Sequence, residues 1–145
     1  MEYRSPQTEE EFEGYYRLRW EVLRKPWGHA RGTERGDDEA SSFHLIAIEG
    51  DEILGVGRLH EREEGVMQIR YMAVAPEGQG RGVGSGMMAA LEMEARRQGA
   101  RRILLDSRES AVSFYEKNGY GIVAESYLLW GEIQHFVMTK EICGS

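Results

Sequence analysis

The sequence predicts one mixed α/β domain, and three observations support this fold class. Three strand-like segments follow one another between residues 43 and 76, a helix and a further strand come next, and two strands end the chain. A strand, a helix and a strand in succession require a crossover, which makes the strands at 66–76 and 102–106 parallel. The 145 residues are the usual length of one domain, so we expect a single domain over 1–145.

The chain is expected to begin with a helix and a long loop. Thr8 and Glu11 form a capping-box pattern, and apolar residues then recur at helical spacing as far as Leu23. Residues 24–42 are polar, carry both signs of charge and show no period, which predicts a loop with room for one helical turn. A loop of this length is either part of a site or disordered, and both alternatives stay open.

The remaining elements are predicted from β-rich runs, helical periods and turn residues. Residues 43–50 and 52–61 form two strands joined by a turn, and the first is apolar on both faces, which predicts a central strand. Pro76 ends the third strand of this meander. The next helix, from Val83 to Gly99, is expected to turn Glu92 outward. A short helix at 110–119 and strands at 101–107, 120–130 and 132–142 complete the prediction.

The composition argues against several classes of partner. Asp and Glu number 25 against 18 Lys and Arg, so the negative net charge disfavours a nucleic-acid partner. The first residues hold no apolar segment typical of a signal peptide, and no apolar run approaches the ~20 residues that cross a bilayer. We therefore expect a cytoplasmic protein with no membrane partner. The single cysteine, Cys143, excludes an internal disulfide and a multi-cysteine metal site, and we expect no metal.

The run EGQGRGVGSG, residues 77–86, places a glycine at every second position between a strand and a helix. Gly84 and Gly86 fall in the first helical turns, where each glycine costs roughly 0.5 to 1 kcal/mol relative to alanine. Unpaired N–H groups at a helix start, without Cβ atoms in front of them, suit an anion such as a diphosphate. Arg81 can add a side-chain contact. A merely flexible connection is the alternative.

Two other phosphate-binding motifs fit this run less well. No Lys-Ser or Lys-Thr pair follows the glycines, which excludes a Walker A loop. The segment GSGMMA, residues 84–89, matches a dinucleotide fingerprint, and Asp106 stands where a ribose-binding acid belongs. The preceding strand ends at Pro76, too early for that turn, and the fold begins with an antiparallel meander. Both facts disfavour a nicotinamide dinucleotide site.

The segment VAPEGQGRGVGSGMM resembles the signature of the GNAT superfamily of N-acetyltransferases, in which a strand ending in V-x-P precedes Q/R-x-x-G-x-G/A. The segment AVSFYEKNGY, residues 111–120, is similar to the second landmark of that superfamily, A-x-x-F-Y-x-x-x-G-F/Y. The resemblance covers residues 43–140. It implies a three-layer α/β fold, in which a central mixed sheet of about six to seven strands holds a splayed parallel pair and carries helices on both faces.

The resemblance implies that acetyl-CoA is the acyl donor. Main-chain N–H groups would hold its pyrophosphate, and its pantetheine arm would pair with a strand backbone as an added strand does. The implied cofactor-binding residues are Met72, Ala73, Val74, Gln79, Gly80, Arg81, Gly82, Val83, Gly84 and Ser85. The acetyl group would pass directly to a primary amine of a small molecule or peptide in a ternary complex. Members of this family often form homodimers.

The resemblance also suggests catalytic groups. Tyr115 occupies the position of the family's frequent proton donor to the departing thiolate, and its neighbour Phe114 is expected in the core. Gln68 stands where some members carry a glutamate base, so we expect another group to act as the base. His135 in the last strand is the first candidate, and a purely structural histidine is the alternative. Other candidates are Glu132, His60, His44 and a water chain.

Other functions and the acceptor stay open at this point. A module that binds CoA or an acyl-CoA without turning it over is one alternative, and a nicotinamide dinucleotide binder is another. We expect the first helix, the 24–42 loop and the last two strands, which include Glu125 and Trp130, to shape the acceptor site.

Overall fold

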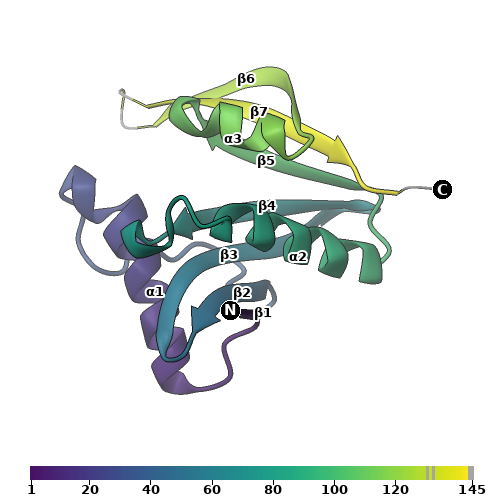
Figure 1. Ribbon diagram of the computed structural model, residues 1–145. Helices are drawn as coiled ribbons and strands as arrows, with labels where there is room; N and C mark the ends of the chain where they lie inside the picture. Colours follow the sequence, from purple (N-terminus) through teal and green to yellow (C-terminus); the bar gives the residue numbers. More distant parts are fainter. Residues whose placement is uncertain (130, 132, 144–145) are drawn as a thin grey trace. The chain divides into compact units, whose positions relative to one another are not determined.

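Seven strands are hydrogen-bonded in the order β1-β2-β3-β4-β5-β7-β6 (Figure 1). The structure is a computed structural model that describes residues 1–129, 131 and 133–143. The strands are β1 (Glu2–Arg4), β2 (Phe43–Glu49), β3 (Glu52–Glu63), β4 (Val66–Val74), β5 (Arg102–Arg108), β6 (Gly121–Leu129) and β7 (Ile133–Glu141). The helices are α1 (Glu9–Leu23), α2 (Val83–Arg97) and α3 (Val112–Lys117), with short 3-10 turns η1 (Lys25–Trp27), η2 (Pro76–Gly78) and η3 (Glu109–Ala111).

The pairing of these strands is mixed, as the sequence predicted. β2 is antiparallel to β1 and β3, and β7 is antiparallel to β5 and β6, whereas β4 and β5 are parallel. The parallel register runs from Val66 opposite Arg102 to Ile69 opposite Leu105. The last part of β4, residues 70–74, therefore lies beyond this pairing.

The chain divides into two compact units. The first comprises Met1–His60 and Tyr71–Leu91, and the second comprises Glu61–Arg70 and Glu92–Ser145. Among the described residues, no helix combines the length and the apolar character that crossing a membrane requires.

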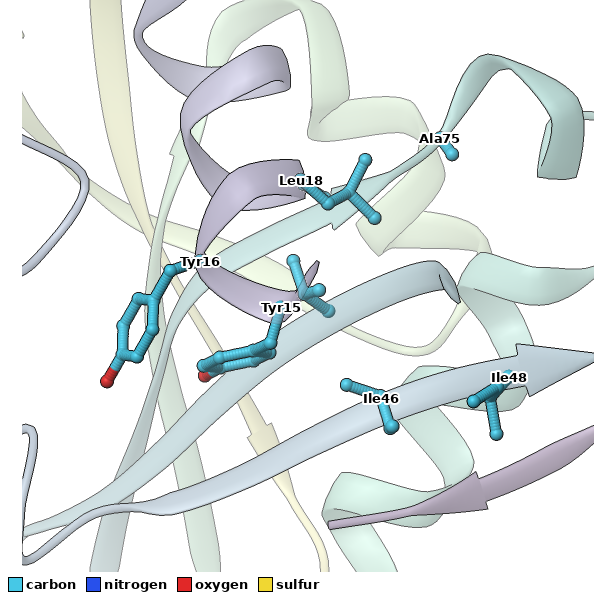
Figure 2. Close-up of a cluster of buried hydrophobic side chains, with 8 residues drawn as sticks. Tyr15, Tyr16, Leu18, Ile46, Ile48 and Ala75 are labelled. Carbon is cyan, nitrogen blue, oxygen red and sulfur yellow. The ribbon is translucent and has the colours of Figure 1, made fainter. Parts of the chain in front are cut away.

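In the first unit, α1 covers one face of β2 and β3. The helix begins as predicted, because the Thr8 hydroxyl accepts a hydrogen bond from the Glu11 N–H at 3.1 Å. Figure 2 shows Tyr15 and Leu18 of α1 in the buried cluster that also contains Ile46 of β2. Even-numbered positions of β2 thus face α1, as the period of a strand requires.

The opposite face of this strand pair receives α2. A Cβ on Gly55 would lie 3.0 Å from a methyl group of Val83, and one on Gly57 would lie 3.2 Å from a methyl group of Leu91. The two glycines therefore bring the helix close to the sheet. Helices pack on both faces of this strand pair, as the apolar residues on both faces of 43–50 predicted. The expectation of a central strand was wrong, because β2 lies next to the edge strand β1 in the sheet.

Buried charges hold the loop between α1 and β2 in the first unit. The Glu39 carboxylate lies 3.0 Å from Nη1 of Arg19 on α1 and 2.8 Å from Nη1 of Arg58 on β3. Both arginine side chains are essentially inaccessible to solvent, and the Tyr16 hydroxyl donates to the same carboxylate. One carboxylate therefore fixes the loop to two elements of the first unit, and the predicted helical turn is η1.

In the second unit, Glu92 of α2 is buried, so the expectation that it faces solvent was wrong. Its carboxylate accepts hydrogen bonds from the Tyr120 hydroxyl and from Nζ of Lys140 on β7, both at 2.9 Å. The helical period predicted that Glu92 lies on the solvent-facing side of α2. In the structure, this side of the helix contacts Tyr120 and β7.

The Glu39 contacts lead to a prediction about stability. We expect Glu39→Gln to lower the free energy of unfolding by roughly 3 kcal/mol, because two buried guanidinium groups lose the anion that they share. Urea unfolding at neutral pH measures this change, and Glu2→Gln at the exposed end of β1 is the control.

The contacts of Glu39 also determine how the stability difference between the parent protein and Glu39→Gln depends on pH. Burial raises the pKa of Glu39, but the Gly36 N–H and the Arg19 charge outweigh burial, so the pKa lies below its ordinary value. The stabilisation by Glu39 is fully present above the ordinary carboxyl pKa of the unfolded chain. It is lost as the pH falls through the lower pKa that Glu39 has in the folded protein. Equal stabilities of variant and parent at neutral pH would contradict the role given to Glu39.

Candidate active site

The loop between η2 and α2 presents backbone N–H groups that have no acceptor. Gly80 and Gly82 have φ angles of 75° and 78°, a conformation that residues with a Cβ atom rarely adopt. The first helical hydrogen bond runs from the Gly86 N–H to the Gly82 carbonyl at 3.0 Å. Within the part of the chain that the structure describes, the N–H groups of residues 80–85 donate to no backbone or side-chain acceptor.

The glycines of this loop serve two different purposes. A Cβ on Gly80 or Gly82 would meet no atom within 4 Å, so packing does not require a glycine at either position. Their left-handed φ angles explain both glycines. A Cβ on Gly86 would instead collide with the hydroxyl and ring of Tyr3 on β1. Gly86 is therefore required for packing, which corrects the expectation that an anion offsets its cost in the helix.

The Arg81 side chain is engaged outside the loop. Its guanidinium group lies 2.9 Å from the Glu49 carboxylate at the end of β2, and both side chains are largely exposed. The Arg81 N–H remains among the groups without an acceptor. The positive end of the α2 dipole adds to these N–H groups, since the helix begins at Val83.

The last part of β4 carries an unusual backbone conformation. Tyr71 has a φ angle of 57°, in the left-handed region that costs a non-glycine residue about 1 kcal/mol or more. Met72 and Val74 after it are half-buried, and Ala73 is buried. The Ala75 N–H donates to the Leu54 carbonyl at 2.8 Å, which fixes the end of the strand against β3.

In the second unit, Tyr115 on α3 is 8% exposed and its neighbour Phe114 is only half-buried. This reverses the expected burial of the two residues, because the Tyr115 ring packs edge-on against Tyr120. Burial raises the pKa of Tyr115, and the nearby Arg108 charge opposes that shift only in part. The hydroxyl stays protonated, and it makes no hydrogen bond to any residue that the structure describes.

His135 on β7 is buried and held in one orientation. Its ring stacks on Tyr127 of β6 with 4.3 Å between centroids. Nδ1 lies 3.0 Å from the Ile133 carbonyl, so it carries the proton and leaves Nε2 as an acceptor. Burial lowers the pKa of His135, and Arg108 acts in the same direction. The imidazole is therefore neutral at neutral pH and able to accept a proton.

The other candidates for the base are less suited to that role. His44 lies between the Tyr15 hydroxyl at 2.7 Å and the Glu39 carbonyl at 2.6 Å, so both ring nitrogens are occupied. Nδ1 of His60 lies 3.3 Å from an Arg58 nitrogen, which donates to it. Glu132 and Trp130 lie outside the described residues. Among the described residues, no three or more His, Cys, Asp or Glu side chains are grouped to hold a metal ion.

Two features of this region had no signal in the sequence. The left-handed backbone at Tyr71 cannot be read from a β-rich run, because tyrosine is an ordinary strand residue. Asp106 was noted only as an acid for a dinucleotide ribose, yet in the structure it accepts a hydrogen bond from Ser126 on β6. That contact depends on strand order rather than on local sequence.

The sequence profile described as "Acetyltransferase (GNAT) family" matches residues 12–120 of this chain. The chain belongs to the GNAT family. It is an N-acetyltransferase of that family, and GNAT acetyltransferases use acetyl-CoA. The Bacillus subtilis protein "Uncharacterized N-acetyltransferase YjcF" is 30% identical over 134 residues, which cover 92% of this chain and 95% of that protein.

Solved structures of other proteins share this fold. An aminoglycoside 6'-N-acetyltransferase complexed with coenzyme A has a TM-score of 0.81 and 18% identity, with 100% of this chain and 99% of that chain covered. Escherichia coli ElaA has a TM-score of 0.82 and 19% identity, with 97% and 99% covered. The GNAT fold predicted from the two sequence landmarks is therefore confirmed.

The left-handed glycines lead to a second prediction. We expect Gly82→Ala to weaken binding of CoA by tenfold or more, because a strained residue at this position shifts the N–H groups that follow it. The strain itself should cost about 1 kcal/mol of stability. Calorimetric titration with CoA measures the first effect, and Gly50→Ala in the β2–β3 turn, with a φ angle of 61°, is the matched control. Unchanged affinity in Gly82→Ala would show that the loop does not bind CoA.

Proposed function

We propose that this enzyme transfers the acetyl group of acetyl-CoA directly to a primary amine of a small molecule or peptide in a ternary complex. The observation that carries the proposal is the set of backbone N–H groups of residues 80–85 at the start of α2, which donate to no acceptor among the described residues. Such groups at a helix start suit a pyrophosphate. The use of acetyl-CoA by the family and the coenzyme A in the aminoglycoside 6'-N-acetyltransferase structure support this donor.

The donor would be held by main-chain groups of the first unit. The loop N–H groups would bind the pyrophosphate, and the part of β4 that lies beyond the parallel pairing would bind the amide-containing arm. The residues proposed to hold acetyl-CoA are Met72, Ala73, Val74, Gln79, Gly80, Arg81, Gly82, Val83, Gly84 and Ser85. Acetyl-CoA supplies the activated acyl group, and the chain supplies binding and proton transfer.

Tyr115 is proposed to stabilise the departing thiolate. Its hydroxyl is protonated and has no acceptor among the described residues. A tyrosine with an ordinary pKa of about 10 is a weaker acid than a thiol with a pKa of about 8.5. Burial raises the pKa of Tyr115 and so increases this difference. Tyr115 would therefore act mainly as a hydrogen-bond donor to the charge that develops on sulfur.

His135 is proposed as the base that removes a proton from the acceptor ammonium. Its Nε2 has a free lone pair because Nδ1 donates to the Ile133 carbonyl. The stacking contact with Tyr127 fixes the plane of the ring. A neutral amine is the reactive form in acyl transfer, so a neutral imidazole near the acceptor supports the reaction.

We expect Tyr115→Phe to lower kcat about tenfold to a hundredfold, because the thiolate loses its hydrogen-bond donor. Release of free thiol from acetyl-CoA with a panel of primary amines measures the rate. Ser113→Ala on the exposed side of α3 is the control. A wild-type protein that is stabilised by CoA but turns over no amine would instead be a CoA-binding sensor.

The role of His135 predicts a dependence on pH. We expect kcat/KM of the wild type to fall as the pH drops through a value below 6.5, because protonation of His135 removes the base. His135→Gln should lower kcat/KM at neutral pH and lose this acid limb. A pH profile of both proteins between pH 5 and 8, taken as the range in which histidine titrates, is the measurement. An acid limb that persists unchanged in His135→Gln would assign it to another group.

A further inference from the structure

Asp106 on β5 is a half-buried carboxylate at the point where the parallel pairing of the second unit ends. The last paired residues are Ile69 and Leu105, so Asp106 is the first residue of β5 beyond the pairing. Its Oδ1 accepts a hydrogen bond from the Ser126 hydroxyl at 2.7 Å. Its Oδ2 lies 3.5 Å from Nε2 of Gln68.

The orientation of the Gln68 amide follows from its other contact. Nη1 of Arg62 lies 2.9 Å from Oε1 of Gln68. A guanidinium group only donates hydrogen bonds, so the oxygen of the amide faces Arg62 and the NH₂ group faces Asp106. Gln68, at the position where some family members carry a glutamate, thus orients the carboxylate of Asp106.

This carboxylate has no cationic partner among the described residues. No nitrogen of a lysine, arginine or histidine in that part of the chain lies within 4.0 Å of its oxygens. The nearby Arg62 contacts the Gln68 amide rather than Asp106. A carboxylate can accept about four hydrogen bonds, and Asp106 accepts one from Ser126 and one from Gln68. Asp106 therefore retains capacity for a cationic donor.

Asp106 also lies in the surroundings of His135. The Asp106 charge raises the pKa of the His135 imidazole, although burial and Arg108 outweigh it. Asp106 is opposite Val137 in the register of β5 and β7, and Arg108 is opposite His135. The fixed carboxylate and the proposed base are thus neighbours on the strands of the second unit.

We propose that Asp106 binds the ammonium group of the acceptor and thereby selects amines that are cationic at neutral pH. This inference rests on the proposed acetyl transfer and adds the charge of the acceptor to it. Ser126 and Gln68 hold the carboxylate in place, and its remaining lone pairs accept hydrogen bonds from the ammonium group. An acceptor bound in this way presents its nitrogen beside His135.

The test compares two amines of similar size and different charge. Benzylamine is protonated at neutral pH and aniline is not, so only benzylamine can form the ion pair. Calorimetric titration of each amine into the protein saturated with CoA measures binding without turnover. We expect Asp106→Asn to weaken benzylamine binding about tenfold to a hundredfold, and to leave aniline and CoA binding unchanged.

Two control variants distinguish the effect of the Asp106 charge from an effect on the fold. Glu64→Gln removes one negative charge from the exposed turn between β3 and β4 in the second unit and should leave the preference for benzylamine intact. Ser126→Ala removes the hydrogen bond to Asp106 but keeps its charge, so most of the preference should persist. Unchanged CoA affinity in Asp106→Asn shows that this variant is folded.

The outcomes distinguish this inference from the proposed function. Equal preference for benzylamine in the wild type and Asp106→Asn, or a wild type that binds benzylamine no more tightly than aniline, would overturn the assignment of Asp106. A wild type that releases no thiol from acetyl-CoA with any amine would overturn acetyl transfer. In that case, the calorimetric comparison of benzylamine and aniline still tests whether Asp106 binds an ammonium group.

Discussion

Backbone N–H groups without acceptors are the constraint on which this account of the molecule depends. The loop of residues 80–85 presents N–H groups that donate to no acceptor among the described residues, although backbone N–H groups are strong donors that are normally paired. Two restraints fix it in the first unit. Gly80 and Gly82 adopt left-handed conformations, and α2 is packed closely onto β3 through Gly55 and Gly57. The loop is thereby presented by a rigid helix and sheet.

The second unit contributes groups whose protonation states are set by their surroundings. Burial keeps the Tyr115 hydroxyl protonated and the His135 imidazole neutral, so one can donate and the other can accept. The Asp106 carboxyl group accepts hydrogen bonds from the Ser126 hydroxyl and the Gln68 amide, which fix its position. The second unit thus holds a hydrogen-bond donor, a base and an anion, which are the groups that the proposed transfer to a cationic amine would use.

Local sequence patterns predicted most of the fold and, at the candidate site, the glycine loop before α2. The periods of α1 and α2, the strands from β2 to β5 and the glycine loop are properties of short segments, so the sequence contains them. The strand β1 was not predicted, because its three residues are too few to show the period of a strand. Gly86 and Glu92 were misjudged because their contacts, Tyr3 and Lys140, are distant in sequence. The contacts of Asp106 with Gln68 and Ser126 likewise depend on strand order, which no local pattern reports.

The most direct test of the account is hydrogen exchange of the backbone N–H groups of residues 80–85, measured with and without CoA. Groups that lack acceptors exchange fast in the free protein, whereas N–H groups that bind a pyrophosphate are protected. We expect strong slowing by CoA in a peptide that covers this loop, and little change at the exposed turn Gly50–Asp51. Exchange in the loop that is already slow without CoA, or that CoA leaves unchanged, would contradict it.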